Sequence, residues 1–565
     1  MKRLIVLSGL ILMVILSSCQ TDKTADLVLY NGKVVTLDSS NTVAQAIAIQ
    51  GDRILAVGPS KAIKQLAKPN AKVIDVHGAL VIPGLIEGHA HFLSLGNALL
   101  NLDLSKAHTW QDIVDSVANR VKRSKPGEWI IGRGWHQEKW DRLPEPLVEG
   151  YPVHTELSAV SPENPVILTH ASGHAVFVNQ KAMQLAGITA KTADPKGGRI
   201  VKDKNGNPTG VLLENAEDLV WKVYYRTHKN NDEKRWRAAR KAMAECLRNG
   251  ITSFHDAGAS FEDVDFFKKL ADQGKLKVRL YVMLLEPIGH LKEKMDQYRM
   301  IGYGNNFLTV RAIKRYMDGA LGSRGAWLLK PYSDMPNSAG MNVIPLDSLL
   351  QTAELAIDHG FQLCTHAIGD RANREVLNIY QTVFKEHPDK KDLRWRIEHA
   401  QLIAPADLPR FAQLGVIASM QGIHCTSDGP WVPARIGNKR AKEEGYLWQS
   451  LWLSGAVVTM GTDAPIEAID PMANFYALIT RRMKNGQYFY PEQCLTPDQA
   501  LQAYTKNNAY AAFEEKIKGT LEPGKLADIT VLDHDILTVI PDQIPKTKVL
   551  YTIVGGKILY TSVRK

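Results

Sequence analysis

One stretch limits what this chain can become more than any other. It is an apolar run that ends in two histidines, Val81-Ile-Pro-Gly-Leu-Ile-Glu-Gly-His-Ala-His91. Successive side chains of a β-strand point to opposite faces, so His89 and His91 project to the same side. Two imidazoles on one face of a rigid element make half of a metal site. A lone His-x-His is more often a pair of ordinary polar residues at a strand end, so a metal site requires matching ligands elsewhere.

Those matching ligands follow later in the chain, each at the end of an apolar run. Residues 360–366 end in His366, residues 393–399 in His399, and residues 457–463 in Asp463. The chemistry of α/β barrels sits where strands end and loops begin, so these positions predict one shared metal site.

Imidazole and carboxylate ligands without a thiolate suit Zn²⁺, with Mn²⁺, Fe²⁺ and Ni²⁺ as alternatives. A cation of this kind lowers the pKa of its bound water from ~15.7 towards ~7, which makes hydroxide available for attack at neutral pH. Asp463 is the predicted general base and acid, because a carboxylate beside the cation can take a proton from the attacking water and pass it to a leaving nitrogen.

Strand-like runs alternate with helical patterns along most of the chain, which predicts a parallel sheet covered by helices. Eight runs qualify, the number that closes a (β/α)₈ barrel. The two chain ends, 26–82 and 520–562, are each too small to bury a core and are expected to form one composite β-sandwich. Residues 83–519 then form the barrel, with a large insertion at about 100–240 after strand 1. The eight runs are 79–91, 251–256, 278–285, 310–317, 361–366, 394–399, 416–420 and 457–462.

Residues 1–19 are typical of a bacterial lipoprotein signal peptide. Basic residues precede an apolar run too short to span a bilayer, and the run ends in Leu16-Ser-Ser-Cys19, which resembles a lipobox. Cleavage there would leave a lipid-anchored Cys19 in the cell envelope, and Gln20 in the next position fits the outer membrane. An ordinary secretory signal with an incidental cysteine is the alternative.

The formal net charge of +10 does not indicate a nucleic-acid partner. Lysines and arginines are interleaved with acids, as in 229–235, which is typical of a solvated surface. The cysteines after Cys19 are widely spaced and include no Cys-x-x-Cys, so neither a thiolate zinc site nor a disulfide is predicted. We expect a small-molecule substrate and leave the oligomeric state open.

A set of motifs resembles the amidohydrolase superfamily, and more narrowly its YtcJ-like, amidohydrolase-3 branch. The likeness runs from about residue 26 to the C-terminus and implies a distorted (β/α)₈ barrel with a composite β-sandwich. Many members hold two metals bridged by a carboxylated lysine at the end of strand 4, which makes Lys314 the candidate bridge and one or two ions the expected count. The alternatives are that Lys314 faces solvent or pairs with Asp318. Glu87, on the same strand face as His89, is a further ligand candidate. The motifs are Pro83-Gly-Leu-Ile-Glu-Gly-His-Ala-His91, Gly250-Ile-Thr-Ser-Phe-His-Asp256, Asp318-Gly-Ala-Leu-Gly-Ser323, Thr365-His-Ala-Ile-Gly-Asp370, Ile397-Glu-His-Ala400 and Gly461-Thr-Asp463.

The insertion supplies candidates for the substrate pocket. His174 could polarise a substrate carbonyl or hold its oxyanion, which would make it a second catalytic residue. The alternative is a loop histidine packed under an aromatic ring. Trp135 and His136 are further substrate-binding candidates.

Three barrel residues complete the candidate pocket. His255, at the end of strand 2, is expected either to contact substrate or to orient a metal ligand through a hydrogen bond. Arg324 and Arg371 could bind an acidic group of the substrate, and the alternative for both is a surface ion pair.

These features predict a metal-dependent hydrolase of a non-peptide carbon–nitrogen bond, such as an amide, N-acyl or N-formyl group. Lactone, ester or cyclic-imide hydrolysis is the alternative on the same scaffold, because the same chemistry serves those carbonyls. A non-catalytic envelope binding protein is the alternative of another class. The substrate itself depends on loop geometry that the sequence does not specify.

Overall fold

The computed structural model describes residues 24–227 and 232–563. Its centre is a barrel of eight parallel strands that pair in chain order, as predicted. The first strand is joined to the segment after the last one, because Asp463 N donates to His89 O (2.8 Å) and His91 N to Ala464 O (2.8 Å). The strands are β8 (Leu85–Ala90), β17 (Ile251–Ala259), β18 (Arg279–Leu284), β20 (Leu308–Tyr316), β21 (Gln362–Ala367), β22 (Arg396–His399), β23 (Ile417–Met420) and β24 (Val458–Met460).

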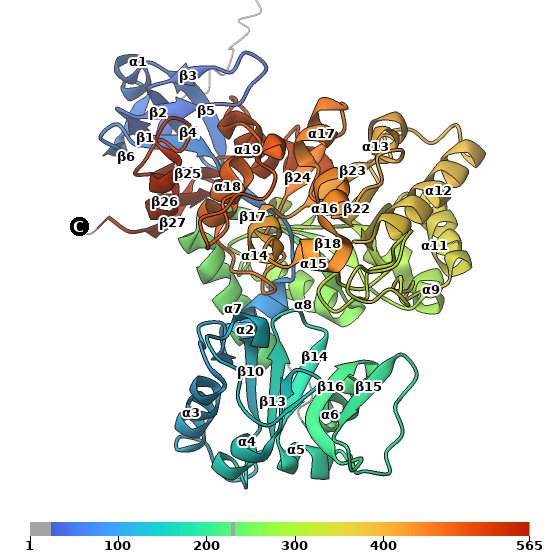
Figure 1. The fold of residues 1–565 in the computed structure, drawn as a ribbon. Helices are drawn as coiled ribbons and strands as arrows, with labels where there is room; N and C mark the ends of the chain where they lie inside the picture. The colour runs from blue at the N-terminus through green and yellow to red at the C-terminus, as the bar shows by residue number, and fades with distance from the viewer. Residues whose placement is uncertain (1–23, 228–231, 564–565) are drawn as a thin grey trace, which may run out of the picture.

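Helices between these strands surround the barrel (Figure 1). Their buried apolar side chains pack on the outer face of the strands in one large cluster. The main ones are α2 (Phe92–Ala98), α7 (Asp232–Arg248), α8 (Phe261–Asp272), α9 (Ile288–Tyr298), α11 (Leu346–Asp358), α12 (Asp370–Glu386), α13 (Leu408–Leu414), α17 (Trp448–Leu453), α18 (Pro471–Thr480), α19 (Pro497–Tyr504) and α20 (Lys506–Ala511).

Both ends of the chain build the β-sandwich beside the barrel (Figure 1, blue and red). The ends are joined where β25 (Ile529–Leu532) pairs antiparallel with β7 (Leu80–Pro83). Apolar side chains from both ends, including Leu27, Ile47 and Ile553, form the core between the two sheets. One sheet contains β1 (Ala25–Tyr30), β4 (Ala46–Gln50), β5 (Arg53–Gly58) and β6 (Ala67–Asp75), with α1 (Ser60–Lys64) against it. The other adds β2 (Lys33–Val35), β3 (Val43–Ala44), β26 (Val549–Val554) and β27 (Lys557–Thr561).

The prediction that 79–91 is a single strand is wrong. The run divides at Gly84 into β7, which belongs to the sandwich, and β8, which belongs to the barrel. A Cβ at Gly84 would lie 2.2 Å from Thr252 Oγ1, so the chain passes from one sheet to the other where no side chain fits. An apolar run shows that a segment is buried but not in which sheet it pairs.

The insertion after strand 1 forms a separate body beside the barrel, the insertion lobe (residues 102–227; Figure 1, teal). A six-stranded mixed sheet carries an apolar cluster on each face. Its last two strands form a hairpin that turns at Asn205-Gly206, where Asp203 Oδ1 accepts from the backbone N–H groups of Asn205 and Asn207. The strands are β9 (Leu102–Asp103), β10 (Ile130–Trp135), β13 (Val166–His170), β14 (Ala175–Val178), β15 (Gly198–Lys202) and β16 (Pro208–Glu214). The helices are α3 (Trp110–Val121), α4 (Thr155–Val160), α5 (Gln180–Leu185) and α6 (Asp218–Thr227).

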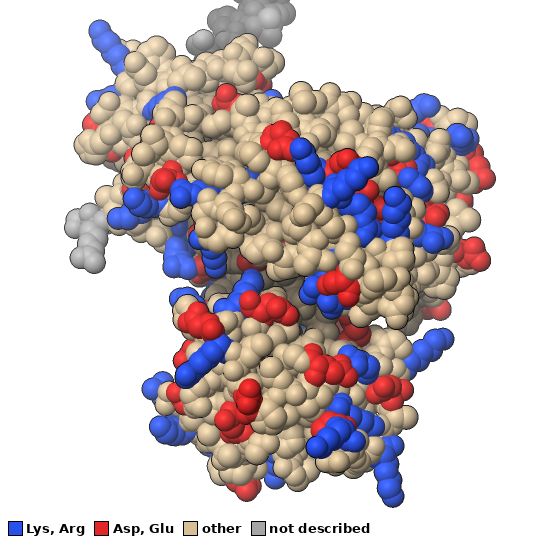
Figure 2. Space-filling view, in the orientation of Figure 1, with Lys and Arg blue, Asp and Glu red and all other residues tan. Residues whose placement is uncertain are grey.

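The face drawn in Figure 2 mixes the two signs of charge, and it is hollowed where the lobe meets the barrel. In the described part of the chain, no helix is both long and apolar enough to cross a membrane. Cys246, Cys364, Cys425 and Cys494 are free thiols. The predicted signal peptide and Cys19 lie outside the described residues.

Candidate metal centre

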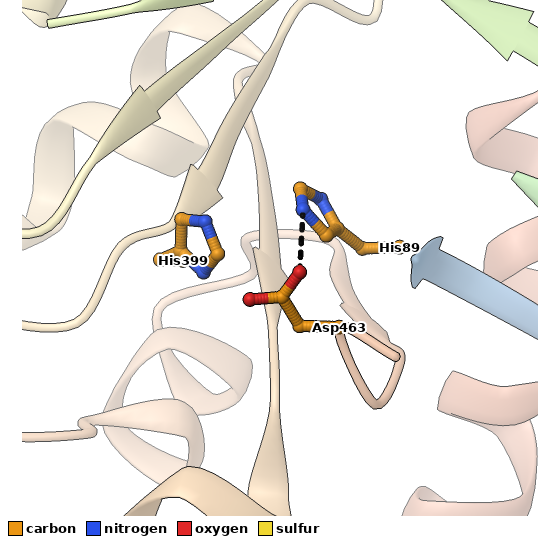
Figure 3. A group of neighbouring side chains, drawn as sticks. All are labelled: His89, His399 and Asp463. Carbon is orange, nitrogen blue, oxygen red and sulfur yellow. Dashed lines mark ion pairs between the residues drawn. The ribbon is translucent and has the colours of Figure 1, made fainter. Parts of the chain in front are cut away.

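Three side chains from distant parts of the chain meet at the carboxyl end of the barrel. His89, His399 and Asp463 each place one ligand atom within 4.8 Å of the others (Figure 3). His89 Nε2 lies 3.6 Å from Asp463 Oδ1, and His91 Nε2 lies 3.3 Å from the same oxygen. The ends of strands 1, 6 and 8 therefore place three candidate ligands together at one rim of the barrel.

Two of these residues hold an unusual backbone conformation. His399 has a φ of 73° and Asp463 a φ of 58°, in the left-handed region that residues with a Cβ seldom adopt. Both lie at the point where a barrel strand gives way to its loop, so the bend aims the side chain into the barrel mouth. Strain of this kind concentrates at functional sites.

His366 and Lys314 lie in the same cluster. The His366 ring is 4.5 Å from the His399 ring, and His366 Nε2 is 3.6 Å from Asp318 Oδ1. Lys314 is fully buried, its Nζ 4.8 Å from the centre of the Tyr316 ring. The two alternatives for Lys314 are both wrong, because it does not face solvent and Asp318 accepts instead from the backbone N–H groups of Trp327, Ile368 and Gly369.

The cluster fits a divalent cation. Five of its buried polar atoms have no hydrogen-bond partner among the described residues, and a buried polar group without a partner costs about 1–3 kcal/mol. Imidazole nitrogens and a carboxylate oxygen gathered without partners are the donor set that Zn²⁺ and related ions take. The five atoms are His89 Nε2, His366 Nε2, His424 Nε2, Lys314 Nζ and Asp463 Oδ1.

The protonation states also suit metal binding. Burial, with the nearby Lys314 charge, lowers the pKa of His89 to about 4, so its ring is neutral at pH 7. Burial raises the pKa of Asp463, but its close contacts with the imidazoles of His91, His89 and His399 outweigh the burial and hold that pKa well below its usual range. Burial lowers the pKa of Lys314, which makes it easier for the side chain to lose its proton and become a neutral amine.

Behind the ligands lies a second layer of buried polar groups. His89 Nδ1 is hydrogen-bonded to Glu398 Oε2, and the Glu398 carboxylate is paired with Arg396 (Nε–Oε1 2.7 Å). Arg396 Nη1 also lies 3.1 Å from His255 Nδ1, and His255 is fully buried. His255 therefore lies behind the candidate ligands, beside Arg396, and both of its expected roles stay predictions.

Glu87 does not face the cluster. Its carboxylate accepts from Thr462 N (2.7 Å) and Thr462 Oγ1 (3.0 Å), so it joins β8 to the end of the last strand. Burial raises the pKa of Glu87 to about 8, which favours the neutral acid. Glu87 lies two residues before His89 on the same strand, but both of its carboxylate oxygens already accept hydrogen bonds from Thr462.

His174 reaches the barrel mouth from the insertion lobe. Its Nδ1 is 2.9 Å from Glu214 Oε2. Burial lowers the pKa of His174, but the hydrogen bond and charge of Glu214, with the charges of Glu217 and Asp463, raise it overall. His174 therefore meets the requirement of a hydrogen-bond donor beside the candidate metal centre.

Two of the predicted pocket residues have other roles. Trp135 is buried in the lobe core with Nε1 donating to Leu168 O (2.8 Å), so its prediction as a substrate contact is wrong. Arg324 lies 2.8 Å from Asp334 in a part-exposed ion pair, which is the alternative role given for it above. His136 is half-buried against the His170 ring (4.5 Å).

Arg371 also makes a surface ion pair, the alternative role given for it above. Its guanidinium stacks on Trp327 at 4.6 Å and lies 3.9 Å from Glu375.

Sequence reasoning missed His424 and Arg133. His424 Nε2 lies 3.9 Å from Asp463 Oδ2, on α14 (Gly422–Asp428), which starts two residues after β23. The strand-end rule that found the other ligands would have found it. Arg133 bridges the lobe and the barrel, because it donates to Pro465 O (Nε, 3.3 Å) and to Ala171 O (Nη2, 3.1 Å), and nothing local in the sequence shows that contact.

The fold and the site together define a class. A parallel barrel that gathers histidines, a lysine and an aspartate at the carboxyl ends of its strands is the architecture of metal-dependent barrel hydrolases. Residues 72–560 match the Amidohydrolase family, and the chain belongs to that family.

The relatives cover nearly the whole chain. Protein LONG AFTER FAR-RED 3 of Arabidopsis thaliana is 33% identical, over 95% of this chain and 92% of that protein. The putative amidohydrolase YtcJ of Bacillus subtilis is 30% identical (94% and 98%), and the N-substituted formamide deformylase of Arthrobacter pascens is 27% identical (95% and 98%). The predicted YtcJ-like branch is confirmed.

A solved structure gives the same result for the fold. An uncharacterized metal-dependent hydrolase from Pyrococcus horikoshii OT3 superposes with a TM-score of 0.75 at 27% identity, covering 91% of this chain and 99% of that one. The predicted (β/α)₈ fold is confirmed, and the chain is a metal-dependent hydrolase of the amidohydrolase family.

Proposed function

We propose that the protein hydrolyses a non-peptide carbon–nitrogen bond, such as that of an N-formyl or other N-acyl amine. The observation that carries the proposal is the convergence of five unpartnered buried donor atoms at one rim of the barrel. The Arthrobacter pascens relative, an N-substituted formamide deformylase, supports the choice of bond. The same site could serve a lactone, an ester or a cyclic imide, so these remain the alternative substrates.

A divalent cation, with Zn²⁺ as the first candidate, would be held by His89, His91, Lys314, His366, His399 and Asp463, and when bound it acidifies water and polarises a carbonyl. Lys314 is the bridging residue if two ions are present.

The protein's own groups divide the remaining work. Asp463 is ionised at neutral pH, so Oδ1 or Oδ2 can accept the proton of the attacking water. The same carboxyl can then return that proton to the departing nitrogen. His174, held by Glu214, can donate a hydrogen bond to the substrate carbonyl oxygen as negative charge develops there.

The test uses the full-length protein. Elemental analysis should find one or two equivalents of a transition metal, and a panel of N-formyl and N-acyl amines should include turned-over members. Matched esters, lactones and cyclic imides on the same panel separate the alternatives. A protein without stoichiometric metal, or one that binds panel compounds without turnover, would reject the hydrolase proposal, the second result in favour of a binding protein.

We also propose a lipid-anchored place in the cell envelope, supported by the sequence of residues 1–19. Expression in a Gram-negative host with a radiolabelled fatty acid should label the protein, and Cys19→Ser should abolish the label. A Cys19→Ser protein that is labelled as strongly as the wild type would contradict the anchor.

A further inference from the structure

The second layer behind His89 contains charges that stability alone does not explain. Arg396 and Glu398 are fully buried, and their ion pair lies inside the barrel. Replacing a buried ion pair by apolar residues is often neutral or stabilising, so such a pair is weak evidence for a role in stability. Its contacts indicate a different role.

The contacts of Arg396 Nη2 join Glu398 to the strand that carries His89. Nη2 donates to Glu398 Oε2 (3.0 Å), to Ser419 Oγ (2.7 Å) and to the carbonyl oxygen of Gly88 (2.7 Å), the residue before His89. Arg396 therefore holds the Glu398 carboxylate in a frame that includes the backbone of the strand that carries His89.

We propose that Glu398 and Arg396 are positioning residues that hold His89 in the tautomer with its proton on Nδ1, so that Nε2 presents its lone pair to the cation site. A carboxylate paired with an arginine only accepts hydrogen bonds, so the partner atom, His89 Nδ1, must donate. Nε2 is then the nitrogen without a proton, and it is the atom that lies without a partner beside Asp463. This inference rests on the proposed cation site.

His399 shows the same arrangement with a weaker partner. Its Nδ1 lies 2.8 Å from Gln421 Oε1, a neutral amide oxygen. Ser419 connects the two arrangements, because its carbonyl oxygen accepts from Gln421 Nε2 (3.3 Å) and its Oγ from Arg396. A neutral oxygen is the weaker acceptor, so Glu398 should control its histidine more strongly than Gln421 does.

The experiment compares Co²⁺ binding to the wild type and to Glu398→Gln by competition with a chromogenic chelator. The amide of the variant can donate as well as accept, so His89 is free to take either tautomer. We expect Co²⁺ affinity to fall about 10–100-fold, the usual effect of losing such a partner. Equal affinity in the two proteins would overturn the inference alone, whereas a wild type that binds no Co²⁺ would overturn it together with the proposed function.

Asp528→Asn is the matched control. It breaks an equally buried arginine–carboxylate pair, with Arg279, at the other end of the barrel. We expect this variant to lose stability and keep its Co²⁺ affinity. If it loses affinity as much as Glu398→Gln does, general loosening explains both results and the inference fails.

A second measurement does not depend on a variant at Glu398. Histidine labelled with ¹⁵N in the ring, in the metal-free full-length protein, reports the tautomer of each ring, and His89→Gln assigns the signal. We expect a proton on His89 Nδ1 and none on Nε2. A proton found on Nε2 would contradict the proposal even if Glu398→Gln failed to fold.

Discussion

The two ends of the barrel both bury charged side chains, but they satisfy them differently. At the amino end, Arg279 at the start of β18 makes a two-point pair with Asp528 (2.7 and 3.0 Å), and its Nη1 donates to two backbone carbonyls. At the carboxyl end, His89, Lys314 and Asp463 keep buried atoms without partners in the described structure. The first arrangement joins the barrel to the sandwich. The second leaves atoms at the rim that can coordinate a cation, so the rim is where we expect a ligand to bind.

The sharpest test of this difference is Asp463→Asn. The amide cannot take a proton from water, so we expect turnover to fall about 10²–10⁴-fold. Initial rates on the best panel substrate measure the effect, with Asp528→Asn as control, assayed well below its melting temperature. Comparable losses in the two variants would erase the distinction between the two ends.

The reverse effect should appear in stability. Asp528→Asn leaves Arg279 buried without its partner, so we expect a loss of about 3–5 kcal/mol in the free energy of unfolding. Denaturant titration measures it. Asp463→Asn leaves no buried arginine without its partner, because Asp463 faces the His89 and His399 rings, which are neutral at pH 7, so its metal-free form should lose less stability than Asp528→Asn does. A large loss there would mean that the rim is structural.

Removing the metal should weaken the rim and leave the other end intact. A cation present at 100 times its dissociation constant stabilises the fold by about 2.7 kcal/mol, so a chelator should lower the melting temperature of a chain of this length by about 2 °C. Calorimetry measures the shift, and added Zn²⁺ should reverse it. In Asp463→Asn the chelator should have a smaller effect, and a shift of the same size would remove Asp463 from the ligand set.

The smallest expected effect concerns pH. Asp256 lies at the rim end of β17, and burial, opposed by a hydrogen bond from Phe92 N, raises its pKa to about 8. Because the folded pKa exceeds the unfolded one, its contribution to stability is complete below about pH 4 and is lost as pH rises through about 8.

Asp256→Asn keeps the neutral shape, so between about pH 5 and pH 9 the variant should lose less stability than the wild type. One unit of pKa shift corresponds to about 1.4 kcal/mol, and we expect a difference of at least that order. Urea titrations of both proteins at the two pH values measure the difference. If the free energy of unfolding changes equally with pH in the wild type and the variant, Asp256 is not held neutral.

Much of the site was predictable because the relevant signals are local. Alternating and apolar runs show where strands lie, and the strand-end rule then selected His89, His366, His399 and Asp463 without knowledge of their distances. The same rule, applied to the loop after the seventh strand, would have added His424.

Other predictions failed where the deciding contact was long-range. Trp135 follows an aromatic pattern that suits a pocket or a core equally well, and the packing of the lobe placed it in the core. Glu87 accepts hydrogen bonds from Thr462, 375 residues away, whereas Arg324 pairs with Asp334 in the loop that follows it. Local patterns carry no information about which of several chemically equivalent neighbours a side chain will meet.

The order of residues alone therefore indicated the barrel, the strand ends that carry the candidate ligands and the family to which the chain belongs. The break of one apolar run at Gly84, the bridge of Arg133 to Pro465 and the support of His89 by Arg396 and Glu398 became visible only when distant segments packed together. The physical reason is that periodicity reports which face of an element is buried, whereas hydrogen-bond partners are set by three-dimensional packing between segments far apart in the chain.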